Sequence, residues 1–235
     1  MIQKINGIDI HYTVKGSGYP LIMLHGNGED LRIFDELANK FSKAFTVYQI
    51  DSRGHGLSEK TPDISYELMR EDVLRFIRIN KINMPIILGF SDGAIVGLLI
   101  AIKHSSKIMG LISCGANLNP NGLKASTRLY YNVLYKLTKQ DKFKMVIEEP
   151  DIDIKDLQRI DIPVMVIAGE NDVVLREHTQ YISSCIDDSE LRILPKENHS
   201  SYIIRSTKME ELVIQFIKSI IYKHKTEKCC HKDIN

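Results

Sequence analysis

The sequence predicts an α/β protein with a mostly parallel central sheet, helices on both faces of that sheet and a small helical cap. Short apolar segments alternate with longer segments whose apolar residues recur at helical spacing, as in domains built from strand–helix–strand units. One helical segment, at about 93–103, is apolar on nearly all sides, which is typical of a helix at the centre of a domain. The 235 residues suffice for one large domain, and 43% hydrophobic with 26% charged residues is a globular composition.

The first half of the chain predicts a hairpin followed by strands and helices in alternation. Asn6-Gly7 is a strong turn signal between two antiparallel strands within residues 2–14. Apolar stripes such as Leu31, Phe34 and Leu37 predict helices. The other elements expected here are strands at 21–24, 46–50, 85–90 and 108–113, and helices at about 30–42, 66–79 and 93–103.

The second half predicts a helical insertion and then a return to the sheet. Residues 117–160 carry tyrosines and leucines among lysines and are interpreted as a helical cap over the sheet. The α/β core then comprises residues 1–116 and 161–222, and residues 223–235 are expected to be a flexible polar tail. The elements expected after the cap are strands at 164–168 and 191–194, and helices at about 176–186 and 208–222.

Composition and charge exclude several classes of protein. The 31 lysine and arginine residues nearly balance 30 aspartate and glutamate residues, so the chain lacks the basic excess typical of binders of nucleic acid or anionic membranes. The apolar stretch at 94–102 is far shorter than the roughly 20 residues needed to span a bilayer. Residues 1–7 lack the apolar centre of a signal peptide, and four cysteines do not make a disulfide framework. We therefore expect a soluble cytoplasmic protein that acts on a small molecule, with no nucleic-acid or membrane partner.

The most specific local signal is Gly89-Phe90-Ser91-Asp92-Gly93, between a predicted strand and a predicted helix. A nucleophilic hydroxyl at Ser91 would project from a tight, strained turn, and the flanking glycines would let strand and helix backbones approach closely. The start of the following helix also directs its N–H groups and positive dipole end toward an anion formed there. The pattern predicts a serine nucleophile, with a plain turn as the alternative interpretation.

An acyl-transfer serine needs a general base and an acid that orients the base. His199 follows the strand predicted at 191–194, at the carboxyl edge where open parallel sheets form their sites, and is the predicted base. Asp172 follows the strand predicted at 164–168 and is the predicted acid, with Glu170 as the alternative. The other histidines are assigned to structural positions, an exposed helix face or the tail: His11, His25, His55, His104, His178, His224 and His231.

Two backbone N–H groups are needed to stabilise the oxyanion of a tetrahedral intermediate. The residue after the nucleophile supplies one of them, which is the N–H of Asp92. The loop after the strand at 21–24 supplies the other, and we assign it to Asn27, with Gly26 and Gly28 as alternatives. His25 in the same loop is expected to be a structural hydrogen-bonding residue.

Together these motifs resemble the α/β-hydrolase superfamily over nearly the whole chain, up to about residue 222. The resemblance implies that Ser91, Asp172 and His199 form a catalytic triad, and that Asp51, Arg53 and His55 belong to a structural loop beside the site. This chain departs from many relatives in having Asn198 where they carry glycine, and in its shorter cap. The motifs that carry the resemblance are His25-Gly26-Asn27-Gly28, Asp51-Ser52-Arg53-Gly54-His55-Gly56-Leu57-Ser58, Gly89-Phe90-Ser91-Asp92-Gly93, Gly169-Glu170-Asn171-Asp172 and Asn198-His199.

The expected function is that of a serine hydrolase that cleaves a small ester or related acyl substrate through an acyl-enzyme. Acyl transfer, carbon–carbon bond hydrolysis and peptide cleavage use the same triad on this fold, and a catalytically weak ligand-binding or sensor protein is the alternative outside enzymes. Dehalogenation is disfavoured, because relatives that perform it carry aspartate at the position of Ser91. Tyr130 and Tyr131 in the cap indicate either an apolar substrate wall or core packing. No cofactor or metal is expected, including at Cys229-Cys230-His231 in the tail.

Overall fold

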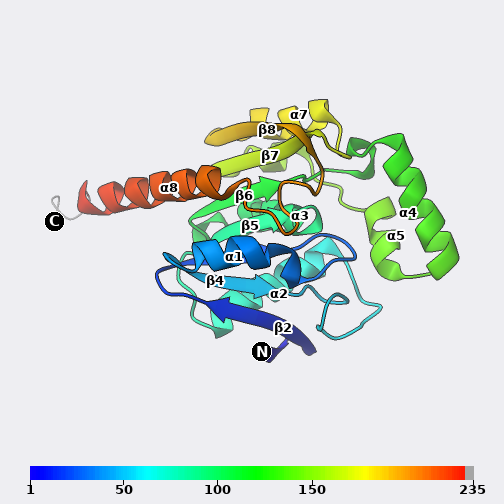
Figure 1. The fold of residues 1–235 in the computed structure, drawn as a ribbon, viewed down its shortest axis with the longest axis horizontal. Helices are drawn as coiled ribbons and strands as arrows, with labels where there is room; N and C mark the ends of the chain where they lie inside the picture. Colours follow the sequence, from blue (N-terminus) through cyan, green and yellow to red (C-terminus); the bar gives the residue numbers. More distant parts are fainter. Residues whose placement is uncertain (231–235) are drawn as a thin grey trace.

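The computed structural model describes residues 1–230, which form an eight-stranded sheet with helices on both faces (Figure 1). The strand order is β1-β2-β4-β3-β5-β6-β7-β8. β2 pairs antiparallel with both β1 and β4, and every other neighbouring pair is parallel. This confirms the predicted fold class. The strands are β1 (Ile2–Ile5), β2 (Ile8–Lys15), β3 (Tyr19–Leu24), β4 (Phe45–Ile50), β5 (Ile86–Phe90), β6 (Gly110–Cys114), β7 (Val164–Asn171) and β8 (Ser189–Asn198).

Two buried clusters hold the helices against the two faces of the sheet. In β3, Leu21 and Met23 belong to the cluster that contains α1 and α8, whereas Ile22 and Leu24 belong to the cluster that contains α2, α3 and α7. This alternation follows from the two-residue period of a strand. The helices are α1 (Asp35–Phe41), α2 (Tyr66–Ile79), α3 (Asp92–His104), α4 (Ala125–Thr138), α5 (Asp141–Glu148), α6 (Ile154–Leu157), α7 (Arg176–Ser184) and α8 (Glu210–Cys230), with single 3₁₀ turns at Leu31–Phe34, Ser105–Lys107 and Pro120–Gly122.

Helix α3 is central, as its apolar composition predicts. Every residue of α3 from Asp92 to Ala101 is buried. The helix starts directly at the end of β5, so the buried backbone at 89–93 is fixed from both sides. The residue between β5 and α3 is Ser91.

The ends of β7 and β8 extend beyond the strands predicted from sequence. Both were expected to stop early, at residues 168 and 194, but a register shift between Gly169 and Asn171 lets the pairing continue to Asn171 opposite Asn198. Such an irregularity is not visible in an apolar pattern, because the added residues are polar. As a result, Asp172 and His199 directly follow two paired residues.

The last helix runs past its predicted end, into the segment from Lys223 that was expected to be a flexible polar tail. α8 continues to Cys230, eight residues past its predicted end at 222. Its sequence contains no glycine or proline, and its polar end carries three lysines and Glu227, residue types that propagate a helix well. Residues 231–235, including His231 of the Cys229-Cys230-His231 cluster, lie outside the described residues.

The segment between β6 and β7 contains α4, α5 and α6. α4 and α5 form a hairpin at the margin of the molecule, beyond the carboxyl ends of the parallel strands (Figure 1). An antiparallel bridge between Leu123 and Val174 ties the base of this cap to the loop after β7. Across residues 1–230, no helix is both long enough and apolar enough to cross a membrane.

Candidate active site

Ser91 occupies a strained turn between β5 and α3. Its φ of +52° and ψ of −114° lie outside the regions that residues with a side chain normally adopt. The flanking glycines permit the close approach that this turn requires. A Cβ on Gly89 would lie 2.2 Å from the Gly93 carbonyl oxygen, and a Cβ on Gly93 would lie 2.1 Å from the Leu24 carbonyl oxygen. The Ser91 backbone N–H donates to the Cys114 carbonyl at 2.8 Å, which fixes the turn against β6.

The structure brings Ser91, His199 and Asp172 together from the ends of three strands. His199 Nδ1 lies 2.6 Å from Asp172 Oδ1, and His199 Nε2 lies 3.2 Å from Ser91 Oγ. A carboxylate only accepts hydrogen bonds, so Nδ1 carries a proton and Nε2 is left to accept the Ser91 hydroxyl proton. This is the geometry in which an imidazole can act as a general base toward a hydroxyl.

Asp172 is held by more than its histidine. Its Oδ2 accepts the Gly169 N–H at 3.1 Å and its Oδ1 accepts the Val174 N–H at 3.0 Å. Burial acts to raise the pKa of Asp172, but the hydrogen bonds from His199, Val174 and Gly169 outweigh it, so this pKa lies below its usual value. The carboxyl group is therefore anionic at neutral pH.

The alternative acid and another late histidine lie elsewhere. Glu170 is exposed and its Oε2 accepts the Lys196 N–H at 2.8 Å, so it supports the end of the β7–β8 pair. His178 was expected on an exposed helix face but is half-buried, because its Nε2 accepts the Leu118 N–H at 2.9 Å and so connects α7 to the cap.

Asn198, the residue in place of a common glycine, orders the loop that carries His199. Its Oδ1 accepts the backbone N–H groups of Ser200 and Ser201, each at 3.0 Å. Its own N–H donates to Ser201 Oγ at 2.9 Å. These local bonds fix the chain on both sides of the imidazole.

The N–H groups predicted to bind an oxyanion are free of protein acceptors. Within the described part of the chain, neither the Asn27 nor the Asp92 backbone N–H donates a hydrogen bond. By contrast, the Gly26 N–H already donates to Glu29 Oε2 at 3.0 Å. Asn27 is thus better placed than the alternative Gly26 to offer a donor.

The side chain of Asp92 forms a network that sequence reasoning missed, since only its N–H was considered. Its Oδ1 accepts the Tyr66 hydroxyl at 2.8 Å, and its Oδ2 accepts Asn27 Nδ2 at 2.9 Å. Asn27 Nδ2 also donates to the Lys142 carbonyl at 2.9 Å, which links the loop after β3 to the cap. Burial raises the pKa of Asp92 to about 6, partly offset by the bonds from Asn27 and Tyr66. The only sequence signal was a carboxylate directly after the serine.

Glu29 is a second carboxyl group that sequence reasoning missed. A Cβ on Gly26 would lie 2.9 Å from both Glu29 Oε2 and Ser91 Cβ, so the carboxyl group and the serine flank the same backbone. Burial raises the pKa of Glu29 to about 7, opposed by the Gly26 N–H and by the charge of His199. A lone glutamate in a polar loop gave no sequence signal for this position.

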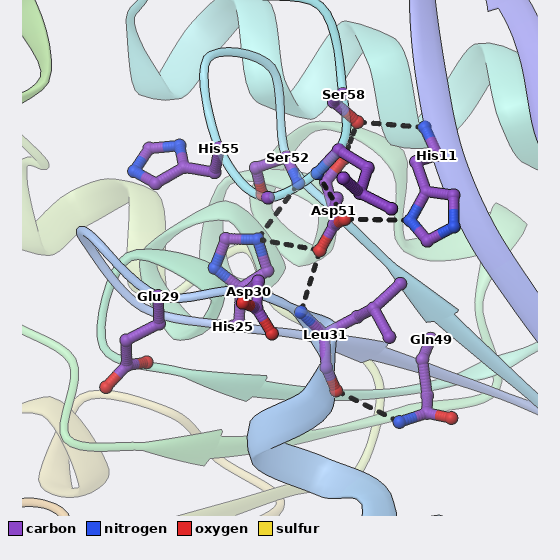
Figure 2. A network of polar contacts seen from close by, with 12 residues as sticks. His11, His25, Glu29, Asp30, Leu31, Gln49, Asp51, Ser52, His55 and Ser58 are labelled. Carbon is purple, nitrogen blue, oxygen red and sulfur yellow. Dashed lines mark hydrogen bonds and ion pairs between the residues drawn. The ribbon is translucent and has the colours of Figure 1, made fainter.

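A buried polar network connects the loop after β3 to the loop after β4 (Figure 2). The two carboxylate oxygens of Asp51 accept the backbone N–H groups of Leu31 at 2.7 Å and Leu57 at 2.9 Å, and Asp51 Oδ2 also lies 2.8 Å from His11 Nδ1. His25 is buried, donates from Nδ1 to the Gly26 carbonyl at 2.8 Å and accepts the Ser52 N–H through Nε2 at 3.0 Å. Burial lowers the pKa of His25, in keeping with a neutral structural imidazole.

Arg53 and His55 also lie within this scaffold. Arg53 makes a two-pronged pair with Asp72, with Nε–Oδ2 at 2.7 Å and Nη2–Oδ1 at 2.8 Å. His55 donates from Nδ1 to the Arg53 carbonyl at 2.9 Å, and burial lowers its pKa to about 3. Neither side chain contacts Ser91 or His199 through a hydrogen bond in residues 1–230.

A cavity of about 330 Å³ opens over Ser91 and His199. The cap supplies one wall, in which Tyr130 and Tyr131 both take part, and Tyr131 also packs against a small buried cluster in the cap, so both interpretations hold for it. No group of three or more histidine, cysteine, aspartate or glutamate side chains in the described region is arranged to hold a metal ion. The remaining lining residues are Tyr66, Asp92, Asn117, Leu123, Ser126, Thr127, Val146 and Val173.

Comparison with known proteins assigns the family. A family model described as alpha/beta hydrolase fold matches residues 19–143, just over half of the chain. The human serine hydrolase BPHL is 27% identical over 251 residues, which cover 91% of this chain and 84% of that protein. In that alignment the chain therefore matches most of its relative.

Solved structures agree with this assignment at the level of the fold. The enol-lactonase from Burkholderia xenovorans LB400 superposes with a TM-score of 0.77 at 20% identity, over 93% of this chain and 100% of that one. A meta-cleavage product hydrolase from Pseudomonas fluorescens IP01 superposes with a TM-score of 0.76 at 18% identity, over 93% of this chain and 98% of that one. With its sheet order, the turn at Ser91 and the matched family model, the chain belongs to the alpha/beta hydrolase fold family.

Proposed function

We propose that this protein is a serine hydrolase that cleaves a small ester or a related acyl substrate through a covalent acyl-enzyme. The observation that carries the proposal is the continuous hydrogen-bonded series from Asp172 through His199 to Ser91 Oγ, which ends at a cavity. A buried carboxylate, an imidazole in the correct tautomer and a hydroxyl in a strained turn are the parts that nucleophilic acyl chemistry requires.

In the first step, Ser91 Oγ attacks the carbonyl carbon while His199 Nε2 accepts the hydroxyl proton. The carbonyl electron pair moves onto the oxygen, and the N–H groups of Asn27 and Asp92 bind the resulting oxyanion. Asp172 keeps the proton on Nδ1 and stabilises the imidazolium. Each oxyanion donor of this kind contributes roughly 10²–10³-fold to the rate.

In the second step, the tetrahedral intermediate collapses and the bond to the leaving alcohol breaks. His199 Nε2 donates its proton to the leaving oxygen, which leaves the acyl group on Ser91. A water molecule then attacks the acyl-enzyme with His199 as base, the acid is released, and the Ser91 hydroxyl is restored.

The cavity supports a small substrate with an apolar portion. Its volume of about 330 Å³ is near the lower end for ligand pockets. Leu123, Val146, Val173 and Tyr131 contribute apolar lining in addition to the polar groups of Ser91 and His199. A short acyl chain or a small lactone satisfies both properties.

Labelling with a fluorophosphonate, followed by measurement of intact mass, tests the nucleophile. We expect one adduct on the wild-type protein, none on Ser91→Ala, and a full adduct on Ser126→Ala, whose side chain lines the same cavity. Turnover of p-nitrophenyl acetate should fall roughly 10⁴–10⁶-fold in Ser91→Ala with the melting temperature unchanged.

The alternatives give different results in the same assays. Retained ester turnover in purified Ser91→Ala would overturn the assignment of Ser91. No adduct and no turnover on folded wild-type protein would favour a ligand-binding or sensor protein. A third outcome is labelling of the protein together with turnover only when an alcohol acceptor, a substrate with a cleavable carbon–carbon bond or a peptide is supplied. That outcome would support the triad but replace ester hydrolysis with another reaction.

A further inference from the structure

The cap helix α4 exposes an apolar face. Leu129, Val133 and Leu137 follow one another at four-residue spacing and therefore form one stripe along the helix. Their exposed fractions are 66%, 45% and 77%, and Tyr130 beside them is 59% exposed. In Figure 1, α4 lies at the outer margin of the molecule, with α5 between it and the sheet. The other described residues therefore leave much of this side of α4 uncovered.

This face is unusual for the surface of this protein. Of the twelve large apolar side chains exposed within residues 1–230, four lie on this one helix. A surface helix normally places its polar residues outward, so an outward apolar stripe indicates an interaction surface.

The charge around the stripe is equally uneven. Residues 117–140 contain Lys124, Arg128, Lys136 and Lys139 but no aspartate or glutamate. None of these four side chains forms an ion pair with another described residue. The expectation of no membrane partner was based on the net charge of +1 for the whole chain. That total does not reveal the local excess of positive charge on this segment.

We propose that the outer face of α4 docks on an anionic lipid surface. Leu129, Val133 and Leu137 would enter the boundary between headgroups and acyl chains, while the flanking cations contact the headgroups. The charge favours this occupant over a second copy of the chain, because self-association through α4 would bring two sets of unpaired cations together.

The docking surface adjoins the cavity over Ser91. Tyr130 belongs to the exposed face and also lines that cavity. Docking would therefore place the cavity entrance at the lipid surface, which suits amphiphilic esters. This consequence for the substrate rests on the proposed function, whereas the docking itself does not.

Sedimentation with vesicles tests the docking directly. We expect the wild-type protein to sediment with phosphatidylcholine vesicles that contain phosphatidylserine, and about tenfold less with phosphatidylcholine alone. The double variant Leu129→Glu/Leu137→Glu should lose binding at least tenfold, and Lys136→Glu/Lys139→Glu should lose it only on the anionic vesicles. Tyr222→Glu is the matched control, since Tyr222 is 71% exposed but lies on α8 at the opposite end of the molecule (Figure 1).

Three results would overturn the proposal. The first is absence of wild-type binding to the anionic vesicles, and the second is equal binding by the double leucine variant. The third is a concentration-dependent dimer, detected by sedimentation velocity, that the leucine substitutions abolish. Turnover of p-nitrophenyl acetate, a soluble ester, is measured in parallel. The α4 variants should retain this turnover, so a failure of docking can be distinguished from a failure of the proposed function.

Discussion

Two histidine–aspartate pairs lie near the same edge of the sheet, and only one adjoins a candidate nucleophile. His11 Nδ1 lies 2.8 Å from Asp51 Oδ2, and His199 Nδ1 lies 2.6 Å from Asp172 Oδ1. The two carboxylate side chains are almost equally buried, with 2% and 3% exposed. The two pairs are therefore nearly alike in N–O distance and in burial of the carboxylate.

The difference lies in what surrounds each pair. Asp51 accepts N–H groups from the segments at Leu31 and Leu57, so it joins three parts of the chain. The far nitrogen of His199 instead faces Ser91 Oγ at 3.2 Å beside a cavity. The comparison teaches that a carboxylate–imidazole pair acquires a chemical role from the group beyond the imidazole.

Among the substitutions that test this comparison, the largest effect is expected at the acid of the second pair. Asp172→Ala should lower kcat roughly 10⁴-fold, because His199 loses both its orientation and the charge that stabilises the imidazolium. Ester turnover at saturating substrate, measured well below the melting temperature, checks this. Glu170→Ala is the matched control two residues away and should change kcat less than about threefold. The opposite ranking would assign the acid to Glu170.

A substitution in the first pair should affect stability more than chemistry. Asp51→Asn keeps the size and shape of the side chain. Its NH₂ group, however, would replace one of the two oxygens that accept a backbone N–H, so two donors would face each other there. An unsatisfied buried donor of this kind costs about 1–3 kcal/mol in the free energy of unfolding. Urea unfolding measures this cost, and kcat of the folded variant should change less than about tenfold. A kcat loss comparable to that of Asp172→Ala would refute the scaffold role.

The smallest effect concerns Glu29, which lies close to the Ser91 turn. Burial raises its pKa from 4.5 to about 7, with His199, Asp92 and Asp30 as the charged groups that act on it. The folded protein thus binds the proton more tightly than the unfolded chain, so stability falls as the pH rises from about 4.5 through about 7.

Glu29→Gln removes this titration and retains an acceptor for the Gly26 N–H. Relative to wild type, the variant should gain stability between about pH 5 and pH 8, on the order of 1 kcal/mol after allowance for partial exposure. Urea unfolding of both proteins at the two pH values measures the gain. A difference that does not depend on pH would show that Glu29 has an ordinary pKa.

Much of the fold was predictable because strong periodic patterns specify it. The apolar helix after Ser91 and the Asn6-Gly7 turn define their elements locally, and all three residues of the hydrogen-bonded series follow strands that apolar runs reveal. Parallel strands place their carboxyl ends at one edge, which is why residues 108 and 27 positions apart in sequence could be expected to meet.

The parts that were missed depend on tertiary contacts or on weak stop signals. The network of Asp92 with Tyr66 and the burial of Glu29 arise from segments that meet only in the folded chain. The apolar residues of α4 indicated a helix but not which of its faces the rest of the protein covers. α8 extends to Cys230 because polarity alone does not end a helix.

The position of β8 has a consequence for synthesis of the protein. β8 is the edge strand next to β7, it follows the other seven strands of the described sheet in the sequence, and His199 follows it directly. Synthesis proceeds from the N-terminus, so Ser91 is made well before the imidazole that would serve as its base. In the proposed mechanism such a nascent chain has no base for its serine, and hydrolysis starts only once the sheet is complete.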